Sequence, residues 1–457
     1  MTTTTDFAEI VQTVEYDGLP EEVIDETKKR ILDSIGIALG SIGERPVEVV
    51  RDTVLELDEN AGPCSIWGAD ERASPPEATM MNTALIRYLD YMDSILLPGE
   101  TPHPSDNIGA VIASGEYLGA SGRDLVTATA LAYEVQGELA AKAPGRDIGW
   151  DHIHVTFSAT AAAAKVFDLD FEQTRDALGI AAASYNPLRT IRTGRISMWK
   201  GIASANMARN AVYTAMLVNN GMEGPKDAIE GQKGWKEIVQ ERDFEVDFSP
   251  ECPRVLEVMT KKYMAGTHAQ AAIEGFEELV SQHAIDLFDI DTVEIETYDS
   301  AHHVMGGGEG DRHTFENREQ ADHSIPYTMM VNALDGQLLK EQYTQDRIRD
   351  DDVLDLVQRV DISVDEDLTN RFNEHGEMAY DIAVHMQDGE TYTTEKRDYD
   401  GHPNNRMTWD QHAEKFNEIA ADVYGPERRS EIISTVRTLE EATVDDLVSL
   451  LGAPATS

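Results

Sequence analysis

A run of basic residues interrupts a chain that is otherwise strongly acidic. Residues 177–222 contain no aspartate and no glutamate. The basic residues of this stretch are Arg189, Arg192, Arg195, Lys200 and Arg209. Arginine and lysine give charge-assisted hydrogen bonds to carboxylates and phosphates, so the stretch predicts a site for a small anion. Buried helices would explain the lack of acid at 177–186 and 210–222, but not the basic cluster between them.

Side chains suited to proton transfer lie on both sides of this basic stretch. His103 follows a loop rich in proline and glycine, His152 precedes an alanine-rich segment, and His268 ends a second small basic cluster. Histidine is the most frequent general acid or base in enzymes. A single histidine in such a place more often packs or caps a helix. These histidines therefore indicate a catalytic site only in combination with the predicted anion site.

The motifs of several large enzyme classes are missing. The sequence has no Walker A motif, no dinucleotide-binding glycine pattern, no HExxH motif and no nucleophile elbow. Its two cysteines, Cys64 and Cys252, are too few for a four-thiolate metal site and give no disulfide framework. We therefore expect proton transfer on a polyanion, with no cofactor and no metal.

The net charge of the chain limits the classes of partner that it can bind. The chain has 38 Lys and Arg against 85 Asp and Glu, a formal net charge of −47 at pH 7. Such a surface repels phosphates and anionic lipids, so we expect no nucleic acid and no membrane as partner. Because 41% of the residues are hydrophobic, the chain can fold, and its evenly spread acid predicts halophilic adaptation. An ordinary acidic protein is the alternative. The few cysteines, together with the lack of a leader pattern or long apolar run, predict a cytoplasmic location.

Apolar residues recur with a helical period from about residue 20 to residue 275, which predicts an all-helical main domain. The first predicted helix begins after Pro20. Further helices are predicted near 45–58, 76–93, 106–119, 122–142, 156–167, 171–184, 203–220 and 267–282. The helix over 76–93 ends with Asp90 and Asp93, whose spacing would place both carboxylates on one face.

The period changes after about residue 285. Alternation within 293–297, 360–364 and 380–386 predicts half-buried strands, and the dipeptide at 388–389 predicts a hairpin to a strand at 391–394. Helices near 327–337 and 344–358 complete a small α+β domain. Beyond residue 401 the helical period resumes behind a capping box at 408–411, and we expect these helices to pack on the first domain. The predicted division is 1–275 with 402–457, which is helical, and 276–401, an α+β lid.

Six segments in sequence order resemble the MmgE/PrpD family over nearly the whole chain. They are Leu89–Ser94, His103–Gly109, Trp150–His152, Ser197–Gly201, Lys262–Gln270 and Asp322–Tyr327. The resemblance implies a mainly α fold, with a large all-helical domain formed by both chain ends and a smaller α+β lid domain, in a homodimer. It also implies that the following residues line the site: Asp90, Ser94, His103, His152, Lys200, His268 and Tyr327, with Lys262 as a weaker member.

The family is known for 2-methylcitrate dehydratases that use no iron–sulfur cluster, and it also includes cis-aconitate decarboxylases. The resemblance therefore implies a hydro-lyase that dehydrates 2-methylcitrate, or a closely related hydroxy tricarboxylate, to 2-methyl-cis-aconitate in propionate catabolism. Two alternatives stay open: decarboxylation of cis-aconitate to itaconate, and an inactive homologue that only binds polycarboxylates. The loop at 95–102 is longer than in decarboxylase-like members, which favours the MmgE-like branch of the family.

Dehydration needs a base, an acid and cations that hold carboxylates while negative charge develops. We expect His103 and His268 to be the acid–base pair. His152 and Tyr327 would be accessory proton donors, and Asp90 would orient His103 or bind the hydroxyl. The expected cations are Arg192, Arg195 and Lys200.

Overall fold

A computed structural model describes residues 2–58, 62–193, 197–308 and 310–454. The chain forms two compact units. Unit 1 combines residues 1–258 with 408–457, and unit 2 consists of residues 259–407. The fold is mainly α with a small α+β part, which confirms the predicted class. No helix in the described part of the chain is long and apolar enough to cross a membrane.

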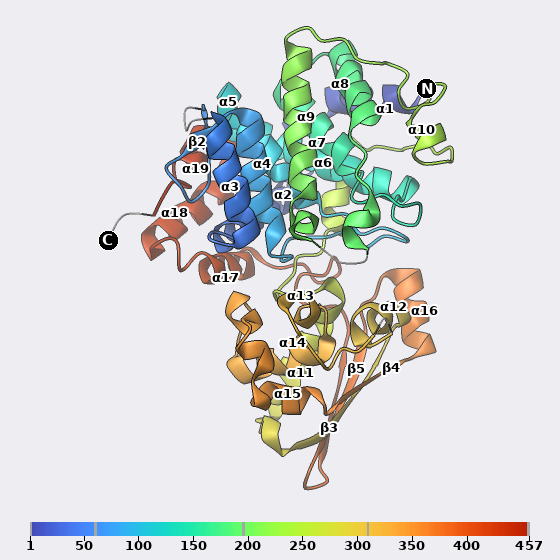
Figure 1. Ribbon diagram of the computed structural model, residues 1–457, viewed down its shortest axis with the longest axis vertical. Helices are drawn as coiled ribbons and strands as arrows, with labels where there is room; N and C mark the ends of the chain where they lie inside the picture. Colours follow the sequence, from blue (N-terminus) through green and yellow to red (C-terminus); the bar gives the residue numbers. More distant parts are fainter. Residues whose placement is uncertain (1, 59–61, 194–196, 309, 455–457) are drawn as a thin grey trace. The chain divides into compact units, whose positions relative to one another are not determined.

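Unit 1 is a bundle of helices with one very short β-ladder (Figure 1). Its helices are α1 (Thr3–Thr13), α2 (Glu21–Gly40), α3 (Arg45–Asp58), α4 (Pro75–Tyr88), α5 (Ile108–Leu118), α6 (Gly122–Lys142), α7 (Val155–Val166), α8 (Phe171–Ser184), α9 (Ala203–Asn219), α10 (Trp235–Ile238), α17 (Trp409–Ile419), α18 (Pro426–Arg437) and α19 (Val444–Val448). The ladder pairs β1 (Cys64–Ser65) with β2 (Arg72–Ala73).

The C-terminal helices belong to unit 1. Thr408 forms the expected capping box with Gln411, which starts α17, and α17 packs along α2. Figure 1 shows these helices in red beside the blue N-terminal helices. The reason is that α17 is amphipathic and buries Phe416 and Ile419, which a bundle of three short helices could not cover alone.

Two predictions for unit 1 are wrong. One helix, α1, precedes the first predicted one; it begins with a run of threonines, weak helix formers, and is held by packing of Phe7 on Phe157, with ring centroids 5.4 Å apart. The helix predicted to reach residue 93 ends at Tyr88, because Asp90 takes a left-handed conformation with φ of 55°. The carboxylates of Asp90 and Asp93 therefore do not share a helix face.

Unit 2 is a four-stranded sheet with helices. The strands are β3 (Ile290–Thr297), β4 (Val360–Val364), β5 (Tyr380–Met386) and β6 (Thr391–Lys396), in the order β4-β3-β5-β6. The helices are α11 (Gln270–His283), α12 (Asp299–Ala301), α13 (Arg318–Ala321), α14 (Ile325–Asp335), α15 (Asp351–Val357) and α16 (Glu366–His375). β3 runs parallel to β4 and antiparallel to β5, and β5 and β6 form the predicted hairpin.

The observed division differs from the predicted boundary at residue 275, which falls inside α11. This helix packs on β5 and β6, and Gly275 allows the close approach because an added Cβ would lie 2.8 Å from Cβ of Lys396. The segment from 259 to 275, which includes His268, therefore belongs to unit 2. Helical periodicity identified α11 but not the layer on which it packs.

Candidate active site

His103 is held in one orientation in unit 1. It directly precedes η2 (Pro104–Asn107), a 3₁₀ turn that leads into α5, and its Nδ1 lies 2.6 Å from the backbone oxygen of Asp93. A carbonyl oxygen only accepts, so Nδ1 carries a proton, and in the neutral ring Nε2 carries the lone pair. The Asp93 carboxylate is itself fixed by the hydroxyl of Tyr133 at 2.7 Å and the backbone N–H of Ser105 at 3.1 Å.

His152 lies beside His103, with ring centroids 5.1 Å apart. It is buried, and its backbone is left-handed with φ of 46°. Its Nε2 lies 3.2 Å from Nη2 of Arg87. Burial and, after it, the positive charge of Arg192 lower the pKa of His152 well below its ordinary value. His152 is therefore uncharged at neutral pH.

Arginines gather around this pair of histidines. Arg87 and Arg146 also lower the pKa of His152 through their charge, and Arg189 shares the buried carboxylate of Asp151 with Arg192. Burial and the charge of Arg146 lower the pKa of Arg189 in turn. These positive charges repel one another, and the repulsion favours the binding of an anion between them.

The same region contains fully buried acids that offset part of the positive charge. Asp106 lies 3.8 Å from Nε of Arg87, and burial raises the pKa of Asp106 to about 6. Asp151 accepts a hydrogen bond from Nε of Arg192 and lies 3.6 Å from Arg189. In the described part of the chain, the buried Nη2 atom of Arg192 has no hydrogen-bond partner. That donor is available for a ligand carboxylate.

The remaining predicted residues of unit 1 lie at different depths. Asp90 is partly exposed, 3.9 Å from Nη1 of Arg87, and Ser94 is fully buried. Lys200 is half-buried in η4 (Met198–Gly201), and no ion pair joins it to another of the residues that the structure describes. Arg195 lies outside the described residues. The structure thus brings Asp90 and His152 to Arg87, with His103 beside His152.

His268 lies in unit 2, in the turn η6 (Thr267–Ala269) before α11. Its Nδ1 is 2.8 Å from the hydroxyl of Tyr298, whose ring stacks on Phe372 with centroids 4.2 Å apart. The hydroxyl of Tyr380 donates to the backbone oxygen of His268. Both the ring and the backbone of His268 are therefore fixed by aromatic residues of this unit.

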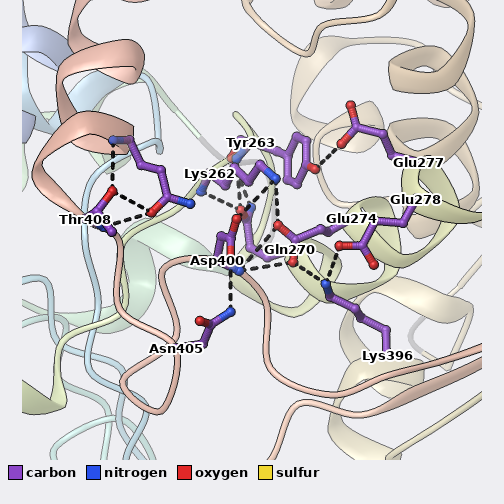
Figure 2. Close-up of polar contacts among 11 residues, drawn as sticks. Lys262, Tyr263, Gln270, Glu274, Glu277, Glu278, Lys396, Asp400, Asn405 and Thr408 are labelled. Carbon is purple, nitrogen blue, oxygen red and sulfur yellow. Dashed lines mark hydrogen bonds and ion pairs between the residues drawn. The ribbon is translucent and has the colours of Figure 1, made fainter. Parts of the chain in front are cut away.

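Lys262 is engaged in an ion-pair network within unit 2. Its Nζ lies 2.6 Å from Glu274 and 3.8 Å from Asp400. Glu274 is fully buried and also pairs with Lys396 at 2.7 Å, and Figure 2 shows these side chains pointing toward one another. The charge of Lys262 thus offsets that of a buried carboxylate, and its role in substrate binding stays a prediction.

Tyr327 also lies in unit 2. Its side chain is buried in unit 2, and its hydroxyl donates to the backbone oxygen of Gln342. The ring packs edge-on against Phe315, with centroids 5.0 Å apart. Burial raises the pKa of Tyr327 above its ordinary value. The proton of the Tyr327 hydroxyl is thus committed to a backbone carbonyl, and the expected role of Tyr327 as an accessory proton donor stays a prediction.

Models of two protein domains match most of the chain. The MmgE/PrpD N-terminal domain matches residues 5–247, and the MmgE/PrpD C-terminal domain matches residues 263–441. The chain belongs to the MmgE/PrpD family. The predicted resemblance is thereby confirmed.

Several curated members of the MmgE/PrpD family are similar to the chain. A 2-methylcitrate dehydratase of Cupriavidus necator is 25% identical over 80% of this chain and 78% of the relative. A 2-methylcitrate dehydratase of Escherichia coli K12 is 25% identical over 71% of this chain and 70% of the relative. A human cis-aconitate decarboxylase is 25% identical over 99% of this chain and 95% of the relative.

Sequence reasoning missed several residues that shape this site of the MmgE/PrpD fold. Arg87, Arg146, Asp106 and Asp151 surround the two histidines, but they were not among the predicted site residues. Arg87 gave one signal: it is a charged residue in the apolar run that ends α4, and such a residue is buried only when it is paired. Among the described residues, no group of histidine, cysteine, aspartate and glutamate has the arrangement of a metal site.

Proposed function

We propose that this protein is a hydro-lyase that dehydrates 2-methylcitrate or a closely related hydroxy tricarboxylate. The observation that carries the proposal is the pair of buried histidines inside a group of arginines in unit 1. Such a site suits a substrate with several carboxylates and a proton that must be removed next to one of them. The names of the bacterial relatives support the same reaction.

The proposed reaction begins with carboxylate binding. Nη2 of Arg192 and Nζ of Lys200 would hold substrate carboxylates, where charge-assisted hydrogen bonds are strong. Nε2 of His103 would take the proton from the carbon next to a carboxylate. The electrons of that C–H bond form the double bond, the C–O bond breaks, and the hydroxyl leaves as water after gaining a proton. Asp90 would bind the hydroxyl. The place of His268 in the acid–base pair remains a prediction.

Decarboxylation of cis-aconitate to itaconate is the second candidate. The human relative with this activity aligns with 99% of the chain, and the reaction also needs a site for several carboxylates. Carbon dioxide would leave in place of hydroxide, so the two reactions differ in product but not in the charge of the substrate.

A proton NMR time course distinguishes the candidates. The purified chain in molar potassium chloride is offered 2-methylcitrate and cis-aconitate separately. A new vinylic species from 2-methylcitrate supports dehydration, and itaconate from cis-aconitate supports decarboxylation. No change with either substrate, in protein shown to be folded, would refute both and leave polycarboxylate binding. We expect His103→Gln to lower turnover about 10²-fold or more, because it removes the base. Full turnover in this variant would remove His103 from the mechanism.

A further inference from the structure

The contact between Arg87 and His152 determines where the imidazole proton lies. Nη2 of Arg87 lies 3.2 Å from Nε2 of His152, although the two residues are 65 positions apart in the chain. A guanidinium group has only donors and does not lose its proton in proteins. Nε2 of His152 must therefore accept, and the single proton of the neutral ring must be on Nδ1.

The other side of the ring faces no protein acceptor in the described part of the chain. Nδ1 of His152 is buried, and it has no hydrogen-bond partner among these residues. A buried N–H group without a partner is costly and is rare in folded proteins. A ligand acceptor would remove this cost.

His103, beside His152, has the opposite arrangement. Nδ1 of His103 donates to the backbone oxygen of Asp93. In His103 the protein therefore binds the same ring nitrogen, Nδ1, that in His152 has no protein partner among the described residues. The two rings thus differ in function although they lie 5.1 Å apart. His103 can take a proton at Nε2, while His152 can only donate a hydrogen bond from Nδ1.

Arg87 is itself held in place on several sides. The side chain is 4% exposed and lies at the end of α4. Its Nη1 lies 3.4 Å from Sδ of Met92 and 3.9 Å from Asp90, and its Nε lies 3.8 Å from Asp106. With Nη2 on His152, the guanidinium is surrounded by protein groups. It is suited to orient a neighbour, and among the described residues its Nε makes no hydrogen bond.

We infer that Arg87 is a positioning residue that holds His152 as the neutral tautomer with its proton on Nδ1, so that His152 donates a hydrogen bond to the substrate. The identity of that acceptor, the hydroxyl that leaves or a carboxylate, rests on the proposed function. The tautomer does not, because it follows from the contact with Arg87 alone.

The test is ¹⁵N NMR of the full chain labelled with ¹⁵N-histidine, which separates protonated from unprotonated ring nitrogens. His152→Gln identifies the signals of His152. In the wild type we expect a protonated Nδ1 and an unprotonated Nε2. We expect Arg87→Met to lose this pattern, and Arg87→Lys, which keeps a donor, to retain it. Turnover should fall about 10²-fold in Arg87→Met with little change in KM, because the predicted carboxylate ligands remain.

Two further variants provide a fallback, in case Arg87→Met does not fold, and a matched control. Arg87→Met leaves Asp106 buried without a cation, so the double variant with Asp106→Asn provides a second protein if the single one does not fold. Arg209→Met is the matched control: Arg209 also pairs with α4, through Glu77, but makes no contact with His152 among the described residues. We expect the wild-type pattern there.

A protonated Nε2 of His152 in the wild type would overturn the inference, and so would an unchanged pattern in Arg87→Met. Neither result depends on turnover. An enzyme inactive on both substrates but with the expected tautomer would refute the proposed function and leave the role of Arg87 intact.

Discussion

Asp106 connects the candidate site to the pH dependence of stability. It is fully buried beside Arg87, and burial raises its pKa to about 6 from an ordinary value of 3.8. Between these two values the folded state binds a proton that the unfolded state has lost. This group therefore stabilises the fold below pH 4, and the stabilisation disappears as the pH rises to about 6. The loss is about 3 kcal/mol, at 1.36 kcal/mol for each pH unit.

Asp106→Asn removes this pH dependence. Relative to the wild type, the variant should gain roughly 3 kcal/mol in free energy of unfolding between pH 4 and pH 7. Urea unfolding at a series of pH values measures the difference. Asp17→Asn, at a side chain that is 88% exposed, is the control and should follow the wild-type curve. Parallel curves for Asp106→Asn and the wild type would contradict the raised pKa.

Arg192 is expected to act mainly on substrate binding. Its Nε is held by Asp151, which leaves the buried Nη2 for a carboxylate. A hydrogen bond to a charged group is worth about 1.5–3 kcal/mol, so Arg192→Met should raise KM roughly 10- to 100-fold. Steady-state kinetics check this. In Arg192→Met the buried Asp151 keeps, among the described residues, only the more distant Arg189 at 3.6 Å. The double variant with Asp151→Asn controls for the weakened pairing of this acid. A fall in kcat at constant KM would instead assign Arg192 to the transition state.

At the scale of elements, the crossing of α4 and α5 positions the turn that carries His103. Gly109, in the first turn of α5, allows this contact, because an added Cβ would lie 2.2 Å from Oγ1 of Thr83 and 2.9 Å from its backbone nitrogen. Backbone atoms cannot move aside as a flexible side chain can. The distance between these two helices is therefore set by a glycine.

Gly109→Ala should lower the free energy of unfolding by about 1–3 kcal/mol and reduce turnover, since it forces α5 away from α4 and shifts His103. Thermal unfolding and kinetics measure the two effects. Gly18→Ala is the matched control, because nothing lies within 4 Å of the added Cβ there. Gly109→Ala with unchanged stability would show that the helices separate without cost.

The ion pairs of unit 2 differ in depth, and we predict that their energies differ accordingly. The Glu274 side chain is 1% exposed and pairs with two lysines. Glu278 is 56% exposed, and among the residues that the structure describes it pairs only with Lys396. Glu274→Gln should cost roughly 1–3 kcal/mol, and Glu278→Gln less than about 1 kcal/mol. Urea unfolding of both variants compares them. Equal losses would mean that burial does not strengthen this network.

At the scale of the whole molecule, a net charge of −47 means that many carboxylates have other carboxylates as neighbours. The open face of the sheet in unit 2 illustrates this: Glu294 lies opposite Asp361, and Asp381 lies between Glu296 and Glu395 in register. Like charges at directly opposed positions destabilise a sheet. Arg397, at 2.7 Å from Asp381, relieves only part of this repulsion.

Salt should therefore stabilise the protein. The Debye length falls from about 10 Å at 0.1 M to about 3 Å at 1 M, so we expect Tm to rise in potassium chloride with most of the rise complete near 1 M. Calorimetry from 0.1 to 3 M checks this. A rise that continues linearly beyond 1 M would indicate exclusion of salt from the surface instead of screening, and a flat or falling Tm would refute halophilic adaptation.

The sequence alone determined the features that depend on neighbouring residues. Helical and alternating periods predicted most helices, the four strands of unit 2, the hairpin and the capping box at Thr408, because these patterns repeat over a few residues. The resemblance of six segments indicated the family. Composition, which needs no knowledge of contacts, indicated a basic stretch that includes Arg192.

Only the tertiary structure decided which side chains meet. Arg87 and His152 lie 65 positions apart, and no local pattern indicates that one fixes the proton of the other. The left-handed backbone at Asp90, the pairing of Lys262 with Glu274, and the burial of the Tyr327 hydroxyl were likewise not predicted. The physical reason is that burial and electrostatic pairing depend on long-range packing, which periodicity does not encode.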